Sequence, residues 1–187
     1  MRELFLKNVK EHQEQVKYFE KNCLESVIEI FEAVRETINS GHCIYLCGNG
    51  GSMADCQHLA GELVGRYKKN RPPLSAVALS TDSALVTCIG NDYAFDEIFS
   101  RQVDALINPG DLLWAFSTSG TSKNILKAVA AARKKKAKVV AFTGKQGNAL
   151  DKLADYSLCA GSDKTNINQE IHELAYHIIC EFIDNEY

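Results

Sequence analysis

After Gly41 the chain alternates between short β-rich runs and longer stretches with helical spacing, and this alternation restricts the fold more than any other feature. The runs are continuously apolar, which is typical of strands covered on both faces. The pattern predicts an α/β fold with a doubly wound, parallel, five-stranded sheet. The expected strands are residues 42–47, 75–79, 111–116, 138–143 and 156–159. The expected helices are residues 52–67, 82–89, 95–107, 122–135, 148–153 and 168–185.

The first forty residues precede this alternation and carry two apolar stripes at helical spacing. The first stripe runs from Phe5 to Cys23 with a polar interruption at His12, and the second runs from Leu24 to Ile38. We therefore expect an N-terminal helical pair. Because this N-terminal segment lies outside the alternating part, we expect it to pack against the same helices of another copy, as an oligomerisation segment spanning residues 1–40.

Length and composition favour a single domain, residues 1–187, of ordinary globular type. The 21 basic and 24 acidic residues are too balanced for the broad positive field of a non-specific nucleic-acid binder. No apolar run approaches the ~20 residues of a membrane span, and the N-terminus lacks the apolar segment of a signal peptide. The seven cysteines include no C-x-x-C pair and are interpreted as reduced thiols. These features predict a cytoplasmic protein without a membrane or nucleic-acid partner.

Two loops rich in glycine and hydroxyl groups follow expected strands. Residues 48–52 read Gly-Asn-Gly-Gly-Ser, and residues 117–122 read Ser-Thr-Ser-Gly-Thr-Ser. In an open parallel sheet, ligands bind beyond the carboxyl ends of the strands, and a helix N-terminus favours an anion. Helix capping alone could explain either loop, but the two together favour a phosphorylated ligand. Met53 takes the place of the third glycine of a dinucleotide fingerprint, and no P-loop Gly-Lys-Ser/Thr occurs.

Polar side chains with acid–base or metal-binding capacity occur in two expected helices. His58 and Glu62 are four residues apart and therefore share one helical face. A surface hydrogen bond is the ordinary explanation of such a pair, but the apolar positions Ala54, Leu59 and Leu63 around it favour partial burial. Gln169 and His177 lie among apolar positions of the last helix. Eight residues of ideal helix span roughly 12 Å, so these two share one site only through an irregular helix or a second chain.

Three other polar segments have simpler interpretations. Asn91 and Asp92 are expected in a turn. Arg66 and the basic segment Lys68–Arg71 are expected in a solvated loop. The basic run at residues 133–138 is expected at a helix C-terminus, where positive charge complements the helix dipole.

Taken together, these motifs resemble those of the bacterial phosphoheptose isomerases, within the sugar isomerase (SIS) family. The resemblance covers essentially the whole chain, through residues 47–52, 58–62, 65–67, 90–92, 117–122 and 169–177. It implies a flavodoxin-like SIS domain and an aldose–ketose isomerase. The implied reaction converts sedoheptulose 7-phosphate to D-glycero-D-manno-heptose 7-phosphate through an enediol, as the first step of nucleotide-activated heptose synthesis for lipopolysaccharide or capsule.

The resemblance also implies site residues, a metal and an assembly. It implies Glu62 and His177 as the catalytic acid–base pair, and a homotetramer with sites between subunits. It implies one zinc ion per subunit, bound by His58, Glu62, Gln169 and His177, whose nitrogen and oxygen donors suit zinc. The substrate-binding residues it implies are Asn49, Gly50, Gly51, Ser52, Glu62, Asn91, Asp92, Ser117, Thr118, Ser119, Ser122 and Gln169. The chain departs from the family at Asn166, where an aspartate is common.

Isomerisation through an enediol requires a base that moves a proton between adjacent carbons, and Glu62 is assigned that role. Glu62 cannot fully serve as base and zinc ligand at once without shifting its metal bond. Three alternatives stay open at this point. They are a non-catalytic SIS protein that binds the replication initiator, an isomerase of another sugar phosphate, and a sugar-phosphate sensor.

Overall fold

The computed structural model describes residues 1–187 and contains one five-stranded parallel sheet of order β2-β1-β3-β4-β5. The strands are β1 (Ile44–Cys47), β2 (Ala76–Ala78), β3 (Leu112–Ser117), β4 (Lys138–Thr143) and β5 (Tyr156–Cys159). The expected doubly wound parallel sheet is confirmed. From β1 the chain passes to β2 on one side and later to β3 on the other, so the strand order reverses between β1 and β3. Such a reversal is where open α/β sheets bind their ligands.

The helices form a layer on each face of the sheet. They are α1 (Arg2–Asn22), α2 (Leu24–Asn39), α3 (Gly51–Val64), α4 (Ser83–Asp92), α5 (Ser100–Leu106), α6 (Lys123–Lys134), α7 (Ala149–Leu153) and α8 (Thr165–Glu186), with a 3₁₀ turn η1 at Phe95–Glu97. None of them combines the length and the apolar composition that a membrane span requires.

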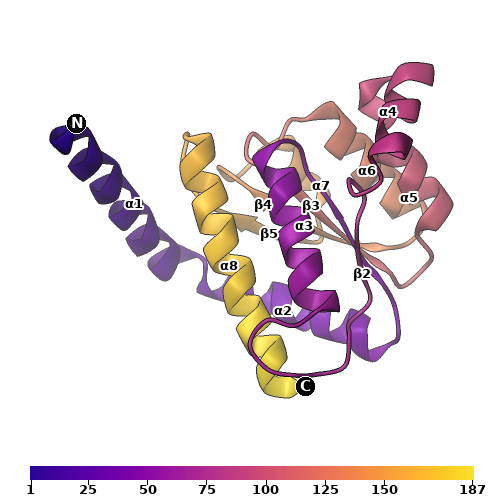
Figure 1. Ribbon diagram of the computed structural model, residues 1–187, viewed down its shortest axis with the longest axis horizontal. Coiled ribbons are helices and arrows are strands. Elements are labelled where there is room, and N and C mark those ends of the chain that lie inside the picture. The colour runs from indigo at the N-terminus through magenta and orange to yellow at the C-terminus, as the bar shows by residue number, and fades with distance from the viewer.

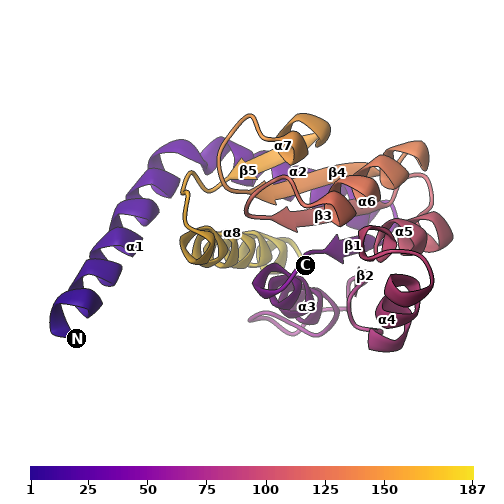
Figure 2. The same cartoon turned by 90° about the horizontal axis from the view of Figure 1, so that it is seen from above.

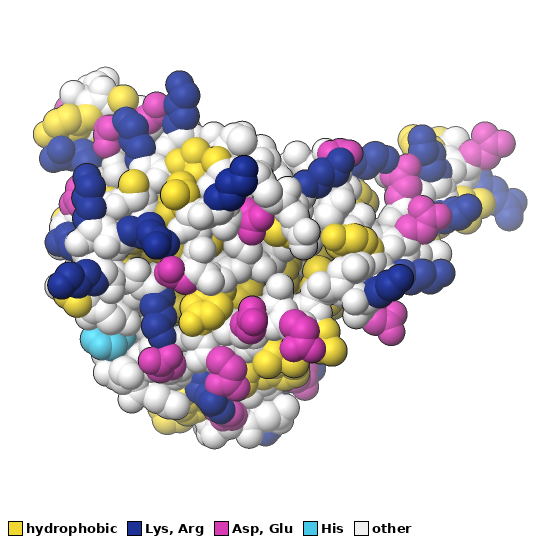
Figure 3. Space-filling view, turned by 180° about the vertical axis from the view of Figure 1, so that it is seen from behind, with side chains coloured by type: hydrophobic (Ala, Val, Ile, Leu, Met, Phe, Trp, Pro, Cys, Tyr) yellow, Lys and Arg dark blue, Asp and Glu magenta, His cyan; other side chains and the backbone are white.

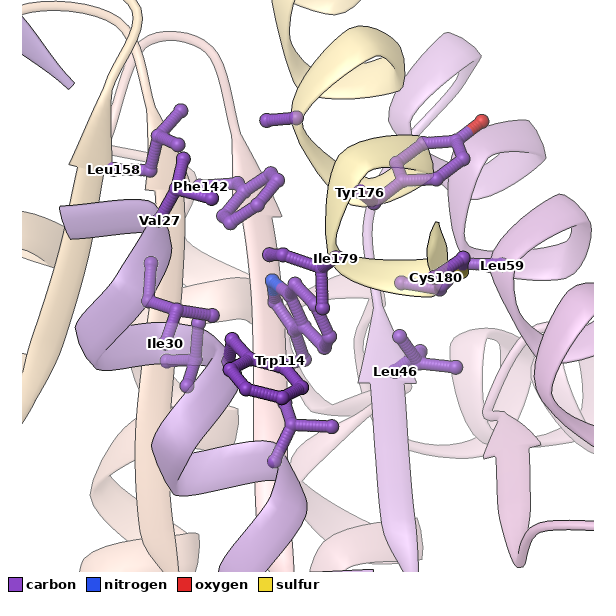
Figure 4. Close-up of a cluster of buried hydrophobic side chains, with 14 of the residues drawn as sticks. Val27, Ile30, Leu46, Leu59, Trp114, Phe142, Leu158, Tyr176, Ile179 and Cys180 are labelled. Carbon is purple, nitrogen blue, oxygen red and sulfur yellow. The ribbon is translucent and has the colours of Figure 1, made fainter. Parts of the chain in front are cut away.

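Alternate side chains of the central strands belong to two separate hydrophobic cores, one on each face of the sheet. Trp114 and Phe142 point to the face covered by α2, α3 and α8, where they share one core with Ile30, Leu59 and Ile179 (Figure 4). Their neighbours Leu113 and Ala141 point to the opposite face, which packs against α5 and α6. Burial on both sides explains why these strands are continuously apolar in sequence.

Helix α1 projects from the rest of the chain (Figures 1 and 2). Its N-terminal half exposes Leu4, Phe5, Leu6 and Val9, whereas Phe19 near its C-terminus is buried. On the face shown in Figure 3, charged side chains cover most of the projecting part, with a few hydrophobic side chains among them. The two expected N-terminal helices are therefore present, but half of the first stripe has no partner within the chain.

Several expected boundaries were wrong. The single helix expected at 95–107 is a 3₁₀ turn followed by the shorter α5, α8 begins at Thr165 rather than 168, and α3 ends at Val64 rather than 67 because Gly65 takes the C-cap position. Asn91 and Asp92 were expected in a turn but form the last turn of α4, which continues through Gly90 to the C-cap at Tyr93.

In the loop after α3, Arg66 and residues 68–70 are exposed as expected, but Arg71 is buried rather than solvated. Its guanidinium donates to Asp184 of α8 at 3.0 Å and to the carbonyls of Glu62 and Leu63 at the end of α3, at 2.7 and 2.9 Å. Burial tends to raise the pKa of the Asp184 carboxyl, but the Lys69 and Lys68 amides and Arg71 together hold it below its usual value. This buried ion pair ties the C-terminal end of α3 to α8.

Candidate functional site

The two glycine and hydroxyl loops lie at the carboxyl ends of β1 and β3 and face a cavity of about 260 Å³. We call this the loop cavity. It is lined by Asn49, Gly50, Gly51, Ser52, Phe116, Ser117, Thr118, Ser122, Thr165 and Gln169. Eight of these residues belong to the predicted substrate-binding set; Phe116 and Thr165 were not predicted.

The first loop turns sharply into α3. Gly50, the N-cap of α3, has φ of 55°, a conformation that favours glycine, and makes no side-chain cap. A Cβ on Gly51 would lie 2.5 Å from the Nε2 atom of Gln169, so the α8 amide packs directly on the loop backbone. The uncapped start of α3 leaves a positive helix end directed at the cavity, as an anion site requires.

Hydrogen bonds between hydroxyl groups and backbone amides organise the second loop. The Ser117 hydroxyl donates to Ser122 at 3.2 Å and accepts the Gly120 amide at 3.2 Å, while Ser119 accepts the Thr121 amide at 3.3 Å. Ser122 is the N-cap of α6 but makes no side-chain cap. Helix capping therefore does not explain why a hydroxyl-bearing residue stands at position 122.

A pair of amide side chains joins the two loops across the boundary between β1 and β3. Asn49 and Asn124 exchange hydrogen bonds of 2.9 and 2.8 Å. Asn124 was not predicted, because nothing in the sequence links it to a residue 75 positions away. The loop cavity thus combines neutral amides, hydroxyls and the N-termini of α3, α6 and α8, without a charged side chain in its lining.

A second group of polar side chains lies between α3 and α8, which run side by side (Figure 1). His58, Glu62 and His177 each offer a ligand atom within 4.8 Å of the others, and we call these three the imidazole cluster. His58 Nε2 lies 3.1 Å from Glu62 Oε1, and the rings of His58 and His177 are 5.0 Å apart. The predicted acid–base pair and three of the four predicted metal ligands thus meet within one chain.

Aromatic side chains and carboxylates surround the imidazole cluster. Tyr67 stacks on His177 with ring centres 5.4 Å apart. Burial and the neighbouring His58 lower the pKa of His177, which keeps its imidazole neutral at pH 7. Burial and the nearby Glu173 raise the pKa of Asp55, one turn before His58, to about 6. Tyr67 and Glu173 belong to motifs of the sequence that are quoted above, whereas no sequence pattern pointed to Asp55.

The donors of the imidazole cluster fit a zinc ion. Two imidazoles and a carboxylate are a ligand set that zinc commonly takes, with a fourth position left open. Gln169 is not among them, since its amide packs on Gly51 in the loop cavity. Because α8 is one continuous helix, helix irregularity does not bring Gln169 to His177.

The remaining predicted substrate-binding residues do not line the loop cavity. Asp92 lines a different cavity, between α4 and α5, with Tyr93 and Arg101. Its carboxylate accepts bonds from Cys88 at 3.4 Å and from Asn91 at 2.9 Å. The chain alone therefore does not bring Asn91 and Asp92 to the loop cavity. Ser119 lies in the second loop without lining the cavity, and Glu62 belongs to the imidazole cluster.

Comparisons with known proteins agree with this geometry. Residues 4–144 match the family model described as the SIS domain. The chain is 43% identical to the phosphoheptose isomerase of Aliarcobacter butzleri over 100% of its own length and 98% of that relative. It superposes on the phosphoheptose isomerase structure from Neisseria gonorrhoeae with a TM-score of 0.93, 37% identity and 98% coverage of both chains. A phosphoheptose isomerase structure from Francisella tularensis gives a TM-score of 0.94 at 34% identity, covering 98% of this chain and 97% of that one.

Proposed function

The chain belongs to the SIS domain family and to its phosphoheptose isomerases, and on this premise we propose that it converts sedoheptulose 7-phosphate to D-glycero-D-manno-heptose 7-phosphate. The imidazole cluster is the observation that carries this proposal. It brings Glu62 of α3 and His177 of α8 together, and the N-terminal ends of both helices line the loop cavity.

The loop cavity suits the phosphate end of the substrate. Amide N–H groups at the starts of α3 and α6 and the hydroxyls of Ser52, Ser117 and Ser122 offer donors to phosphate oxygens. Gln169 and His177 are separated by roughly 12 Å along α8, and an extended seven-carbon sugar phosphate spans a similar length. The substrate would therefore lie along the α3–α8 pair, with its phosphate in the cavity and its carbonyl end at the cluster.

At the cluster, Glu62 takes the proton from C1 of the ketose, and the carbonyl oxygen on C2 gains a proton to give the enediol. The same proton then returns to C2 while the hydroxyl on C1 loses its proton, which leaves the aldose. Because His177 is neutral at pH 7 in the metal-free chain, one ring nitrogen accepts and the other donates, so it can exchange protons with the two oxygens. A zinc ion bound to His177 would occupy one of these nitrogens. Bound zinc would supply polarisation of the carbonyl oxygen.

We propose zinc as the cofactor, with His58, Glu62 and His177 as ligands from this chain. In this proposal Gln169 reaches the metal only by leaving Gly51 or from a second copy. A role for Glu62 as ligand would weaken it as a base, and titration of activity against added zinc would show whether the two roles compete.

We further propose a homotetramer in which residues 1–40 of the single SIS domain form the interface. The exposed Leu4, Phe5 and Val9 of the projecting α1 support this, since an exposed apolar stripe on a helix is normally buried against a partner. Sites between subunits would also give Asn91 and Asp92 of one copy access to the cavity of another. Sedimentation of the full chain and of a Phe5→Glu variant would test the assembly.

A cytoplasmic location and a role in heptose synthesis for lipopolysaccharide or capsule complete the proposal. All seven cysteines are free thiols, which agrees with a reducing compartment. The two glycine and hydroxyl loops recognise phosphate rather than chain length, so pentose and hexosamine phosphates serve as comparison substrates.

The test is incubation of the protein with sedoheptulose 7-phosphate, with and without a chelator, while NMR follows the aldose product. Product that depends on metal supports the zinc-assisted isomerase, and product that survives chelation supports Glu62 and His177 acting without zinc. Absence of product in both arms, with intact binding of the sugar phosphate, would contradict the enzyme and favour a sensor.

A further inference from the structure

Tyr176 contacts the imidazole cluster from the core side of α8. Its side chain is fully buried, and its ring lies at the edge of the core beside Ile179 and Cys180. Figure 4 shows the hydroxyl oxygen turned away from Trp114 and Phe142. That oxygen lies 2.9 Å from Nδ1 of His58, a normal hydrogen-bond length.

This contact fixes one end of the His58 ring. Nδ1 faces Tyr176, and the opposite nitrogen, Nε2, then faces Glu62 at 3.1 Å. The His58 side chain is 43% exposed, so packing alone does not hold the ring in one orientation. The rigid partner is Tyr176, because burial in the core leaves its ring no freedom to follow a moving histidine.

We propose that Tyr176 is a positioning residue that holds His58 with Nε2 directed into the imidazole cluster, so that this nitrogen is ready to bind the metal. The inference rests on the zinc site proposed above. A hydroxyl both donates and accepts hydrogen bonds. It donates to Nδ1 when Nε2–H faces Glu62, and it accepts from Nδ1–H when the lone pair of Nε2 binds a cation. The ring therefore keeps its orientation in both tautomers.

Glu173 adds a preference between the two tautomers. Its Oε1 atom lies 3.6 Å from Nδ1 of His58, too long for a hydrogen bond but close enough for a charge interaction. A carboxylate only accepts protons, so it favours Nδ1–H and thus the tautomer whose Nε2 binds metal. Outer partners of this kind typically change metal affinity by roughly 10- to 100-fold.

The experiment compares Tyr176→Phe with a matched control, Tyr45→Phe. Tyr45 donates its hydroxyl to the Leu106 carbonyl at 3.2 Å and packs against the other core. The first readout is the ¹⁵N spectrum of histidine-labelled, metal-free protein, with His58 assigned by the His58→Gln variant. We expect Tyr176→Phe to shift the His58 Nδ1 resonance and Tyr45→Phe to leave it unchanged. An unchanged Nδ1 resonance in Tyr176→Phe would overturn the proposal.

The second readout is the zinc dissociation constant, measured by competition with a colorimetric chelator. We expect it to rise roughly 10- to 100-fold in Tyr176→Phe, by a few-fold in Glu173→Gln, and not at all in Tyr45→Phe. A zinc affinity that falls in His58→Gln but not in Tyr176→Phe would also overturn the proposal. If the wild-type chain binds no zinc, the proposed metal site fails, and the Nδ1 shift by itself then decides whether Tyr176 positions the ring.

Discussion

The loop cavity and the imidazole cluster, which the proposed function joins into one site, are built in opposite ways. The loop cavity consists of backbone amides, hydroxyls and glycines at the ends of strands, and its lining carries no charged side chain. The imidazole cluster consists of titratable side chains on two helices, and His58 and His177 are 119 residues apart in the sequence. The first arrangement is suited to holding a fixed charge, and the second is suited to moving protons.

The two parts also depend on different elements of the fold. Hydrogen bonding between parallel strands places the loops, because β1 and β3 are adjacent and end at the same edge of the sheet. Packing between α3 and α8 places the cluster, and the ion pair of Arg71 with Asp184 secures that packing. Changes to one part should therefore leave the other largely intact.

The largest expected effect separates chemistry from binding. We expect Glu62→Gln to lower kcat by about 10²- to 10⁴-fold while sugar-phosphate binding is retained, because the base is lost and the loop cavity is unchanged. His177→Gln should act in the same direction. Steady-state kinetics and calorimetric binding measure the two effects. The matched control is Glu181→Gln on the surface of α8, whose carboxylate pairs with Lys68. Full turnover in Glu62→Gln would remove this residue from the mechanism.

The next effect concerns the helix pair. We expect Asp184→Asn to lower the free energy of unfolding by about 3 kcal/mol or more, because Arg71 is left as a buried charge without its partner. Denaturant unfolding measures this. Asp163, which pairs with Lys145 on the surface, supplies the control, and Asp163→Asn should cost less than about 1 kcal/mol. Equal effects in the two variants would show that the ion pair does not hold the helices together.

A smaller effect tests the loop cavity. Gly120 has φ of 65°, and a Cβ there would lie 2.0 Å from Oδ1 of Asn148. We expect Gly120→Ala to cost about 1 to 3 kcal/mol of stability and to raise KM while kcat changes little. Gly147 has φ of 78° and open space around it, so Gly147→Ala carries the backbone strain without the clash. A kcat that falls as steeply as in Glu62→Gln would contradict the independence of the two parts.

The smallest effect depends on pH. The pKa of Asp55 is raised to about 6 in the folded chain from an ordinary value of 3.8, so the folded state binds the extra proton between these values. Stability is then lost as pH rises through about 6. We expect Asp55→Asn to stabilise the metal-free protein by about 1 kcal/mol at pH 7.5, a figure reduced for partial solvent exposure, with no gain at pH 4. Unfolding in urea at the two pH values measures this, and a gain that is larger at pH 4 would reverse the sign.

The sequence by itself determined the sheet, the order of its elements and the two loops, because strand and helix periodicity and turn chemistry are local properties of the chain. It also identified His58, Glu62 and His177 as residues capable of acid–base chemistry or metal binding. Only the tertiary structure decided that these three meet and that Gln169 lies on Gly51 instead. It likewise decided that Arg71 is buried against Asp184 and that Tyr176 holds His58. These contacts join residues far apart in the chain, and the packing of α8 against α3 and the loop after it, which no local pattern encodes, creates them.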